Sequence, residues 1–411
     1  NENGGLSVTG RVNNTLSNVE VLRFADGIYA DGAFRSDATP PPDGSAEDAF
    51  GVLGPSSNRV STVVDAPVAL DAYVSPVSGS RATDGGELIG FDPAEHGSIV
   101  KNGDGAVTYT PDPGFAGTDR LTYTVLEADG SERTGALSVT VRVPWEGSDW
   151  NDRADFQDRD APREIDVGER HDTVVGTPYS DLIRGRPGEN RFSGGEGDDV
   201  FDYAGKENGR AKLVDGGPGF DVLAGSHGDD VMQFRGDAFR SIELIEGGDG
   251  YDVIRGWKWT ESWDFSQTEM TGIELIDTAG GQDSVVGTAG PDVIRGGPGA
   301  DQLWGGKGDD TFDYAGKDNG RDKLVDGGPG YDAVVGSNGD DVMRFNSDTL
   351  RSIERIDGGE GYDVIRGGRW TENWDFSETE MTGIELIDAA GGHDNVVGSP
   401  GTDLIRGGPG E

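Results

Sequence analysis

Short segments in which apolar and polar residues alternate recur along the whole chain, and this pattern predicts strands rather than helices. In the N-terminal third the alternation is clearest at residues 107–110, 121–125 and 137–141. Further along, residues 239–245 and 270–276 alternate in the same way. A period of two places successive side chains on opposite faces of a half-buried strand. The pattern therefore predicts an all-β protein.

The N-terminal third divides into segments of different character. Residues 36–62 contain three consecutive prolines at 40–42, and this composition predicts a linker. Residues 63–143 carry several short strands and the hairpin signals Asn102-Gly103 and Asp129-Gly130, so we expect an immunoglobulin-like β-sandwich. Residues 144–166 are rich in aspartate and are interpreted as an acidic hinge.

Residues 167–411 are repetitive. Residues 176–286 align without gaps with residues 287–397, and 77 positions are identical. Residues 398–411 begin a third copy, and the chain ends inside the repeated motif, so we expect it to be a piece of a longer polypeptide. A regular period of near-identical units indicates a solenoid or an array rather than a set of unrelated domains.

Inside each copy lies a shorter period of nine residues, Gly-Gly-x-Gly-x-Asp-x-U-x, in which U is a large apolar residue. Near matches have Thr or Ser in the second slot, as in the turn that contains Thr288. Glycine permits the backbone of a tight turn, and the residues after the acid form a short strand with its apolar residue inward. Two turns and two strands would close one coil of about eighteen residues. Seven segments fit the pattern fully, and they begin at Gly194, Gly216, Gly247, Gly296, Gly305, Gly327 and Gly358.

The acid in the sixth slot is predicted to be a metal ligand. Carboxylates and converging carbonyls in a flexible turn suit Ca²⁺ better than the smaller, octahedral Mg²⁺. Asp172 lies in the nonapeptide register before the first copy. Asn190 replaces the acid of its turn, so we expect that turn to bind calcium weakly. The predicted carboxylate ligands are Asp181, Asp199, Asp221, Asp230, Asp252, Asp283, Asp292, Asp301, Asp310, Asp332, Asp341, Asp363, Asp394 and Asp403. Turn carbonyls are predicted to complete the sites, such as those of Gly194, Glu196, Gly216, Pro218, Gly247, Asp249, Gly296, Pro298, Gly305, Lys307, Gly327, Pro329, Gly358 and Glu360.

With these motifs, residues 167–411 resemble the RTX family of calcium-binding nonapeptide repeats. The resemblance implies a calcium-bound parallel β-roll solenoid, with Ca²⁺ between successive turns on each side, and export by a type I secretion system. Residues 18–27 resemble the strand pair that commonly closes such a block, so residues 1–35 are interpreted as the closing strands of a preceding RTX block. Residues 96–125 resemble the cadherin-like repeats of bacterial surface proteins and RTX adhesins, which usually act as spacers. The sandwich at residues 63–143 is therefore expected to be cadherin-like or immunoglobulin-like.

The runs of nine are interrupted by acid-to-acid steps of 22, 22 and 31 residues. We interpret the interruptions as wider coils of the same solenoid, because the strand-like segments 239–245 and 270–276 lie within them. A tryptophan-rich insert with Trp259 and Trp263 also lies there and returns as Trp370 and Trp374. Exposed tryptophans stack on the apolar faces of carbohydrate or protein partners. We favour the simpler interpretation that these rings fill a solenoid with few other large side chains.

Composition and charge narrow the range of functions. The chain of 411 residues has a net charge of −43, with 70 glycines and no cysteine. Such an acidic surface repels nucleic acid, and the lack of cysteine excludes disulfides, Cys-ligated zinc and thiol nucleophiles. No apolar run is long enough to span a membrane. Self-repulsion and a sparse core predict repeats that stay unfolded at low calcium and fold when Ca²⁺ neutralises the turns.

No arrangement of His, Ser and acidic residues predicts catalysis, so we expect a protein that is not an enzyme. The expected function is a calcium-binding structural segment of a secreted RTX adhesin, surface or matrix protein, extracellular or at the cell surface. Its expected partners are calcium, the type I secretion machinery, and a cell-surface, carbohydrate or self-assembly partner. An alternative is the secretion and folding tail of an exported protease, lipase or epimerase. Ice binding is a third possibility, but it needs a ladder of Thr and Asn that the fifth slots lack.

Overall fold

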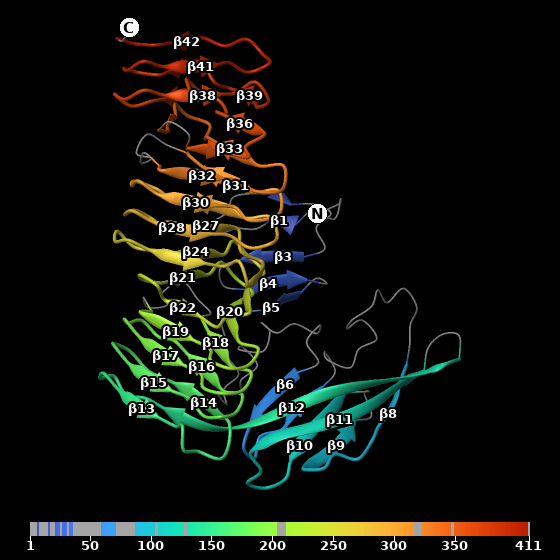
Figure 1. Cartoon of the computed structure of the whole chain (residues 1–411). Helices are drawn as coiled ribbons and strands as arrows, with labels where there is room; N and C mark the ends of the chain where they lie inside the picture. The colour runs from blue at the N-terminus through green and yellow to red at the C-terminus, as the bar shows by residue number, and fades with distance from the viewer. Residues whose placement is uncertain are drawn as a thin grey trace. The chain divides into compact units, whose positions relative to one another are not determined.

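The computed structural model contains only strands as regular elements among the residues it describes (Figure 1). It describes residues 59–70, 87–102, 106–126, 130–203, 211–315, 322–346 and 349–409, together with five short strands before residue 36. The chain divides into two compact units, Asn1–Asp48 and Ala49–Glu411. Most of the predicted linker, residues 36–58, lies outside the described residues, and residues 59–62 belong to a strand.

The first unit contains two small antiparallel sheets. β1 (Leu6–Ser7) pairs with β2 (Thr15–Leu16). β3 (Val21–Phe24), β4 (Gly27–Ala30) and β5 (Ala33–Arg35) form a meander. The strands expected at residues 18–27 coincide with β3 and the start of β4, and their assignment to a preceding RTX block stays a prediction.

Two sheets with antiparallel cores form the start of the second unit. One sheet joins β8 (Glu87–Phe91), β11 (Gly117–Leu126) and β12 (Glu132–Glu146), and β6 (Arg59–Val63) pairs with β12 in parallel. The other joins β7 (Val68–Ala69), β10 (Val107–Pro111) and β9 (Gly97–Lys101). Alternate residues of the long strands enter one buried cluster, which explains the period of two: Val107, Tyr109, Leu121, Tyr123, Val125, Leu137, Val139 and Val141. The immunoglobulin-like sheet region is thereby confirmed.

β12 continues beyond this region into the solenoid. Its last four residues, from Val143 to Glu146, pair in parallel with β14 (Arg163–Asp166). Residues 144–166, which the composition suggests as a hinge, thus contain strands, including β13 (Arg153–Asp155). β13 pairs with β15 (Thr173–Val175), and β14 pairs with β16 (Leu182–Arg184). The parallel stack therefore begins before residue 167.

The narrow part of the solenoid has two strands in each coil. β14, β16 and β18 (Val200–Asp202) lie in one parallel sheet, and β13, β15 and β17 (Arg191–Ser193) lie in the other. Paired residues such as Ile183 and Phe201 are 18 positions apart, as two nonapeptides per coil predict. The middle residue of each short strand points into the core, where Val174, Ile183, Phe192 and Phe201 are buried. The parallel β-solenoid predicted from the repeats is confirmed.

The interruptions in the nonapeptide pattern form wider coils with three strands, one in each of three sheets. After β19 (Leu213–Asp215), the first such coil holds β20 (Val222–Ser226), β21 (Val231–Gln233) and β22 (Phe239–Arg240). The next two hold β23 (Leu244–Gly248), β24 (Val253–Arg255) and β25 (Ser262–Asp264), then β26 (Glu269–Thr271), β27 (Leu275–Asp277) and β28 (Ser284–Val286). Successive coils pair in parallel, as in β20–β23–β26 and β21–β24–β27. The predicted continuation of the solenoid through these segments is confirmed.

The second copy repeats this plan. Its narrow coils contain β29 (Val293–Arg295), β30 (Gln302–Trp304), β31 (Thr311–Asp313) and β32 (Leu324–Asp326). Its wide coils contain β33 (Ala333–Val335), β34 (Val342–Arg344), β35 (Leu350–Arg351), β36 (Arg355–Asp357), β37 (Val364–Arg366), β38 (Asn373–Asp375), β39 (Glu380–Thr382), β40 (Leu386–Asp388) and β41 (Asn395–Val397). β42 (Ile405–Arg406) pairs with β40 and begins the third copy at the top of Figure 1.

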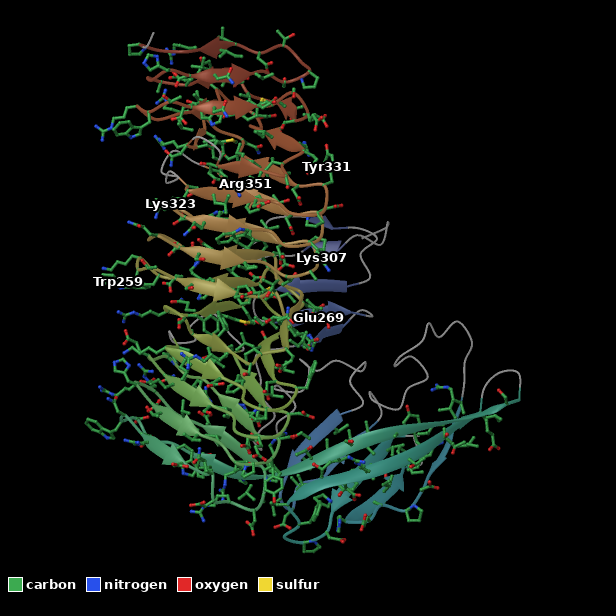
Figure 2. All side chains as sticks on the ribbon, in the orientation of Figure 1. Trp259, Glu269, Lys307, Lys323, Tyr331 and Arg351 are labelled. Carbon is green, nitrogen blue, oxygen red and sulfur yellow. The ribbon has the colours of Figure 1, made fainter. Side chains whose placement is uncertain are left out.

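Large aromatic side chains fill the wide coils. Trp263 and Trp374 are 2% and 4% exposed, and the indole of Trp263 donates to Gly236 O at 3.0 Å. Phe239 packs edge-on against Trp263, with 5.7 Å between the ring centroids. The interpretation of the tryptophans as core-filling residues therefore holds for these two. Trp259 and Trp370 are 52% and 71% exposed instead, and Figure 2 shows Trp259 projecting from one edge of the solenoid.

Candidate metal sites in the turns

The predicted acidic ligands lie in vertical columns at the edges of the solenoid. The amide of Asp181 donates to Asp199 Oδ1 at 2.7 Å, and the amide of Asp199 donates to Asp221 Oδ1 at 2.8 Å. We call each column of acids joined in this way a ladder. Lys307 and Tyr331 mark neighbouring turns of one ladder in Figure 2. The same bond joins Asp230 to Asp252, Asp283 to Asp301, Asp292 to Asp310, Asp310 to Asp332 and Asp341 to Asp363.

The second carboxylate oxygen of most ladder acids has no hydrogen-bond donor. Leaving a buried carboxylate oxygen without a donor or cation costs free energy, because its water shell is lost and nothing replaces it. A cation beside it removes that cost. Among the described residues, Oδ2 is buried and unpartnered in Asp172, Asp199, Asp221, Asp252, Asp283, Asp301, Asp310, Asp332, Asp363 and Asp394.

Backbone carbonyls line the same spaces. A Cβ atom on Gly194 would overlap Asp199 Oδ2 and lie 2.8 Å from Gly216 O, so only glycine leaves this oxygen-lined space open. Gly216 O accepts the amide of Gly195 at 3.1 Å, and Pro218 O accepts the amide of Gly197 at 3.0 Å. A carbonyl has two lone pairs, so each retains one for a cation. Carboxylate and carbonyl oxygens are the donors that Ca²⁺ prefers, so these residues fit calcium. The assignment of individual carbonyls as ligands stays a prediction.

Burial and neighbouring acids raise the pKa values of the ladder carboxyls above their ordinary value near 4. Burial raises the pKa of Asp199 to about 9, and the charges of Asp181 and Asp221 add to the rise. Burial also raises the pKa of Asp221 to about 7, with a contribution from Glu243. The pKa of Asp252 rises to about 7 for the same reasons. A cation would favour the ionised forms, so calcium binding at these turns would release protons.

Six glutamates that the nonapeptide pattern does not include also enter the ladders. Four of them follow a Ser-Ile or Gly-Ile pair, and their Oε2 atoms accept the amide of the acid one coil earlier at 2.6–2.8 Å. These four are Glu243, Glu274, Glu354 and Glu385. Glu261 and Glu372 occupy the sixth slot of the tryptophan-bearing turns and are 0% and 1% exposed. The sequence signal is their position five residues after Gly256 and Gly367, in the nonapeptide register.

Asn190 closes its turn without a cation. Its Oδ1 accepts the amide of Asp172 at 2.9 Å, which is the ladder bond of an acid. Its Nδ2 donates to Arg186 O at 2.9 Å, so a hydrogen-bond donor stands where an acid would place its second oxygen. This geometry agrees with the prediction that the turn binds calcium weakly.

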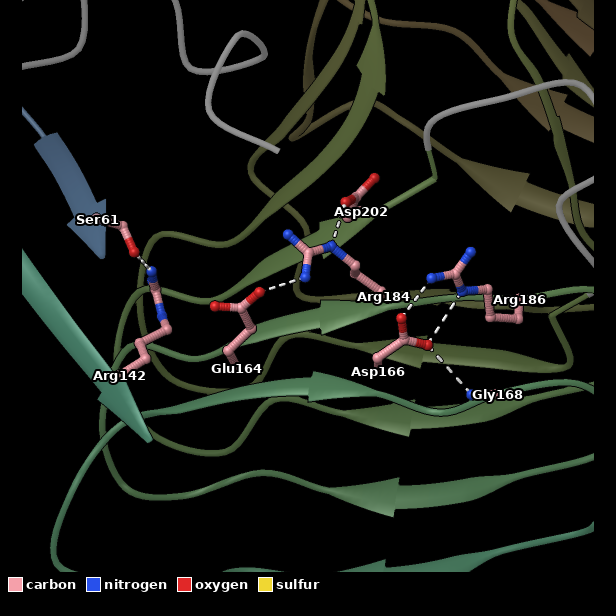
Figure 3. Close-up of polar contacts among 8 residues, drawn as sticks. All are labelled: Ser61, Arg142, Glu164, Asp166, Gly168, Arg184, Arg186 and Asp202. Carbon is pink, nitrogen blue, oxygen red and sulfur yellow. Dashed lines mark hydrogen bonds and ion pairs between the residues drawn. The ribbon is translucent and has the colours of Figure 1, made fainter. Parts of the chain in front are cut away.

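A different set of acids, on the outer face of the first coils, is neutralised by arginine (Figure 3). Arg184 contacts Glu164 on one neighbouring strand and donates from Nε to Asp202 Oδ2 on the other at 3.1 Å. Arg186 binds Asp166. Burial opposes ionisation of Asp166, but hydrogen bonds from Arg186 and from the amide of Gly168 hold its pKa below the ordinary value. Because these acids already have cationic partners, they are not candidate calcium ligands.

The part of the chain that the structure describes contains no cluster of three or more His, Cys, Asp or Glu side chains able to hold a metal. Each turn supplies one acid in the sixth slot, so backbone carbonyls would be needed to complete a calcium site there. His171 instead joins two turns, since its Nδ1 accepts the amide of Glu189 at 2.9 Å. No helix within the described ranges is long and apolar enough to cross a membrane.

Two protein families match the chain. The bacterial Ig domain matches residues 54–141. The RTX calcium-binding nonapeptide repeat matches residues 166–201, 213–238, 240–258, 277–312, 320–349, 351–369 and 382–411, which include every predicted carboxylate ligand. A search of the curated proteins found no match.

Proposed function

The chain combines a bacterial Ig domain with RTX calcium-binding nonapeptide repeats, and we propose that it is a calcium-folded structural segment of a secreted bacterial adhesin, surface or matrix protein. The observation that carries the proposal is the series of buried Oδ2 atoms without donors in these turns, of which those of Asp199 and Asp310 lie beside backbone carbonyls of the next turn. Without a cation these carboxylates oppose folding. With Ca²⁺ they hold successive coils together.

Calcium binding and folding form one event in this proposal. A net charge of −43 and a narrow apolar core keep the repeats unfolded where calcium is scarce, a state suited to type I export. Outside the cell, calcium fills the turns. A site whose Kd is one tenth of the ambient calcium concentration contributes about 1.4 kcal/mol, and roughly ten such sites contribute about 10–15 kcal/mol. That sum is comparable with the whole stability of a typical domain.

A spacer role, rather than a catalytic one, suits the way the two domains are joined. β12 belongs both to the immunoglobulin-like sheet and to the first parallel sheet of the solenoid. A strand shared in this way transmits force through backbone hydrogen bonds instead of through a flexible linker. The exposed rings of Trp259 and Trp370 support a cell-surface, carbohydrate or self-assembly partner at this edge, and Lys258 and Arg369 lie 5.6 Å from the respective ring centroids.

Far-UV circular dichroism of the whole chain, titrated from chelator to 10 mM Ca²⁺, tests the proposal. We expect a cooperative increase in β signal that Mg²⁺ does not reproduce. The immunoglobulin-like domain supplies a constant background, so the increase reports the solenoid. A full β signal already present in chelator would overturn the proposal, because the ladder acids would then fold without a cation.

A further inference from the structure

Sixteen turns carry an aspartate in the sixth slot, and the second slot of each of them adopts one of two backbone conformations. In six turns the slot holds Ser or Thr, and its φ is not positive: Ser148, Thr177, Ser226, Thr288, Ser337 and Ser399. In ten turns it holds Gly or Ala with φ between 66° and 119°: Gly168, Gly195, Gly217, Gly248, Ala279, Gly297, Gly306, Gly328, Gly359 and Ala390. Glycine adopts a positive φ most easily, although Ala279 and Ala390 adopt it here too. The seryl and threonyl slots differ from both in carrying a hydroxyl.

The conformation decides where the amide of the second slot points. With positive φ, the amide of Gly306 leaves its own turn and donates to Gly327 O at 3.2 Å. Without it, the amide of Thr288 points back into its own turn and donates to Asp292 Oδ2 at 2.7 Å. The Thr288 hydroxyl donates to the same oxygen at 3.1 Å. A seryl or threonyl turn therefore supplies its acid with donors that a glycyl turn directs elsewhere.

In every one of these turns, the φ of the second slot matches the hydrogen bonding of the sixth-slot carboxylate. All ten turns with positive φ are those whose acid keeps an unpartnered Oδ2. In all six seryl and threonyl turns, the hydroxyl bonds the acid four residues later. We call the first class open turns and the second class sealed turns.

In four runs along the ladders a sealed turn comes first, and Glu243, Glu274, Glu354 or Glu385 comes last. One run starts at the sealed turn of Asp181, passes through the open turns of Asp199 and Asp221, and ends at Glu243. Three further runs follow the same order: Asp230, Asp252 and Glu274; Asp292, Asp310, Asp332 and Glu354; and Asp341, Asp363 and Glu385.

We propose that the second-slot residue assigns calcium to the open turns alone, while sealed turns close on their own hydroxyl and amide and take no ion through their aspartate. In a sealed turn, two hydrogen-bond donors replace the cation. Each of these four runs then starts on a coil that needs no ion at its first acid, and calcium extends the run from there. This inference rests on the proposed function and deepens it by naming which turns bind calcium.

Two isosteric substitutions in one ladder test the assignment: Asp292→Asn in a sealed turn and Asp310→Asn in the open turn above it. Bound calcium per folded chain is counted by equilibrium dialysis of the full chain in saturating calcium, with circular dichroism as the check on folding. We expect Asp310→Asn to lose one ion and Asp292→Asn to lose none. Equal losses in both variants would overturn the inference.

A converse substitution keeps the test decisive if Asp310→Asn fails to fold. Ser337→Gly removes the hydroxyl and permits positive φ, so we expect the folded chain to gain one ion, as the turn of Gly306 already binds one in the proposal. Ser266→Gly, an exposed position outside the ladders, is the matched control and should change nothing. An unchanged count in Ser337→Gly would contradict the inference. These outcomes differ from failure of the proposed function, in which the unmodified chain does not fold on calcium at all.

Discussion

The guanidinium of Arg142 donates from Nε to the carbonyl oxygen of Ser180 at 3.0 Å, so the strand β12 is bonded to the turn of Asp181, where one of the four runs begins. Arg142 is 3% exposed and also donates to Ser61 (Figure 3). Burial lowers its pKa to about 10, and the charges of Asp181, Glu164 and Asp199 oppose this shift. The residue is therefore a permanent cation beside the first acids of the ladder.

Replacing this cation should weaken both domains at once. Arg142→Met leaves the nearby acids without a compensating charge, and removal of one member of a buried charged set costs about 3–5 kcal/mol. We expect the free energy of unfolding in saturating calcium to fall by that amount, measured by urea denaturation. The calcium midpoint of the β signal should rise as well.

The matched control lies on the same strand. Arg133 is exposed, and Arg133→Met should change the free energy of unfolding by no more than about 0.5 kcal/mol. If both variants lose the same stability, the contact between Arg142 and Ser180 does not couple the domains.

A second pair of substitutions compares the glycine in the fourth slot of an open turn with the glycine in the fourth slot of a sealed turn. Gly308 has φ of 116°, and a Cβ there would lie 2.6 Å from the carbonyl carbon of Gly290. Gly290, in the sealed turn of the preceding coil, has no positive φ and has room for a Cβ. We expect Gly308→Ala to cost about 1–3 kcal/mol and to raise the calcium midpoint. Gly290→Ala should stay within about 0.5 kcal/mol of the parent chain in the same titration.

Much of the solenoid could be predicted because glycine and aspartate recur at fixed positions of the nine-residue period. A tight turn requires glycine, and a three-residue strand requires one apolar residue, so the nonapeptide register fixed the positions of Asp199 and Ile183 in advance. The immunoglobulin-like strands were equally visible, since alternate residues such as Leu121 and Tyr123 face one core.

Other features left weaker signals in the sequence. β13 and β14 bury few side chains, chiefly Ala154 and Ile165, so aspartate-rich turns dominated the composition of residues 144–166. The nonapeptide pattern does not identify Glu261 as a sixth-slot acid, because Trp257 and Trp259 replace the glycines in the second and fourth slots of its turn. Thr288 and Gly306 both occupy the second slot, and the sequence motif does not distinguish the two kinds of turn. The difference depends on the direction of a backbone amide, which composition and spacing do not specify.

The raised pKa values predict opposite effects of pH with and without calcium. The carboxyls of Asp199 and Asp221 have folded-state pKa values of about 9 and 7, above the ordinary value near 4. Without calcium, their contribution to folding is fully present below pH 4 and is lost as the pH rises through 7 to 9. We therefore expect the β signal in chelator to be higher at pH 5 than at pH 8. With calcium, protons compete with the ion, so the calcium midpoint should rise as the pH falls from 8 to 6.

Neutral substitutions distinguish this local effect from the loss of overall negative charge on acidification. Asp199→Asn combined with Asp221→Asn imitates the protonated acids, so this variant should keep more β signal than the parent chain in chelator at pH 8. Glu169→Gln combined with Glu196→Gln removes the same charge at exposed positions. Equal gains in the two variants would assign the pH effect to net charge.

The two classes of tryptophan predict different consequences of truncation. Trp263 is buried against Phe239 and Phe265 in a wide coil, so Trp263→Ala should leave a cavity and cost about 3–5 kcal/mol in urea denaturation with saturating calcium. Trp259→Ala, four residues earlier, removes an exposed ring and should stay within about 0.5 kcal/mol of the parent chain. A large loss in Trp259→Ala would show that this ring stabilises the coil, and the support it gives for a binding partner would disappear. With stability unchanged, the same variant can be assayed for lost retention on polysaccharide or cell-surface material, because any loss then reports a contact made by the indole itself.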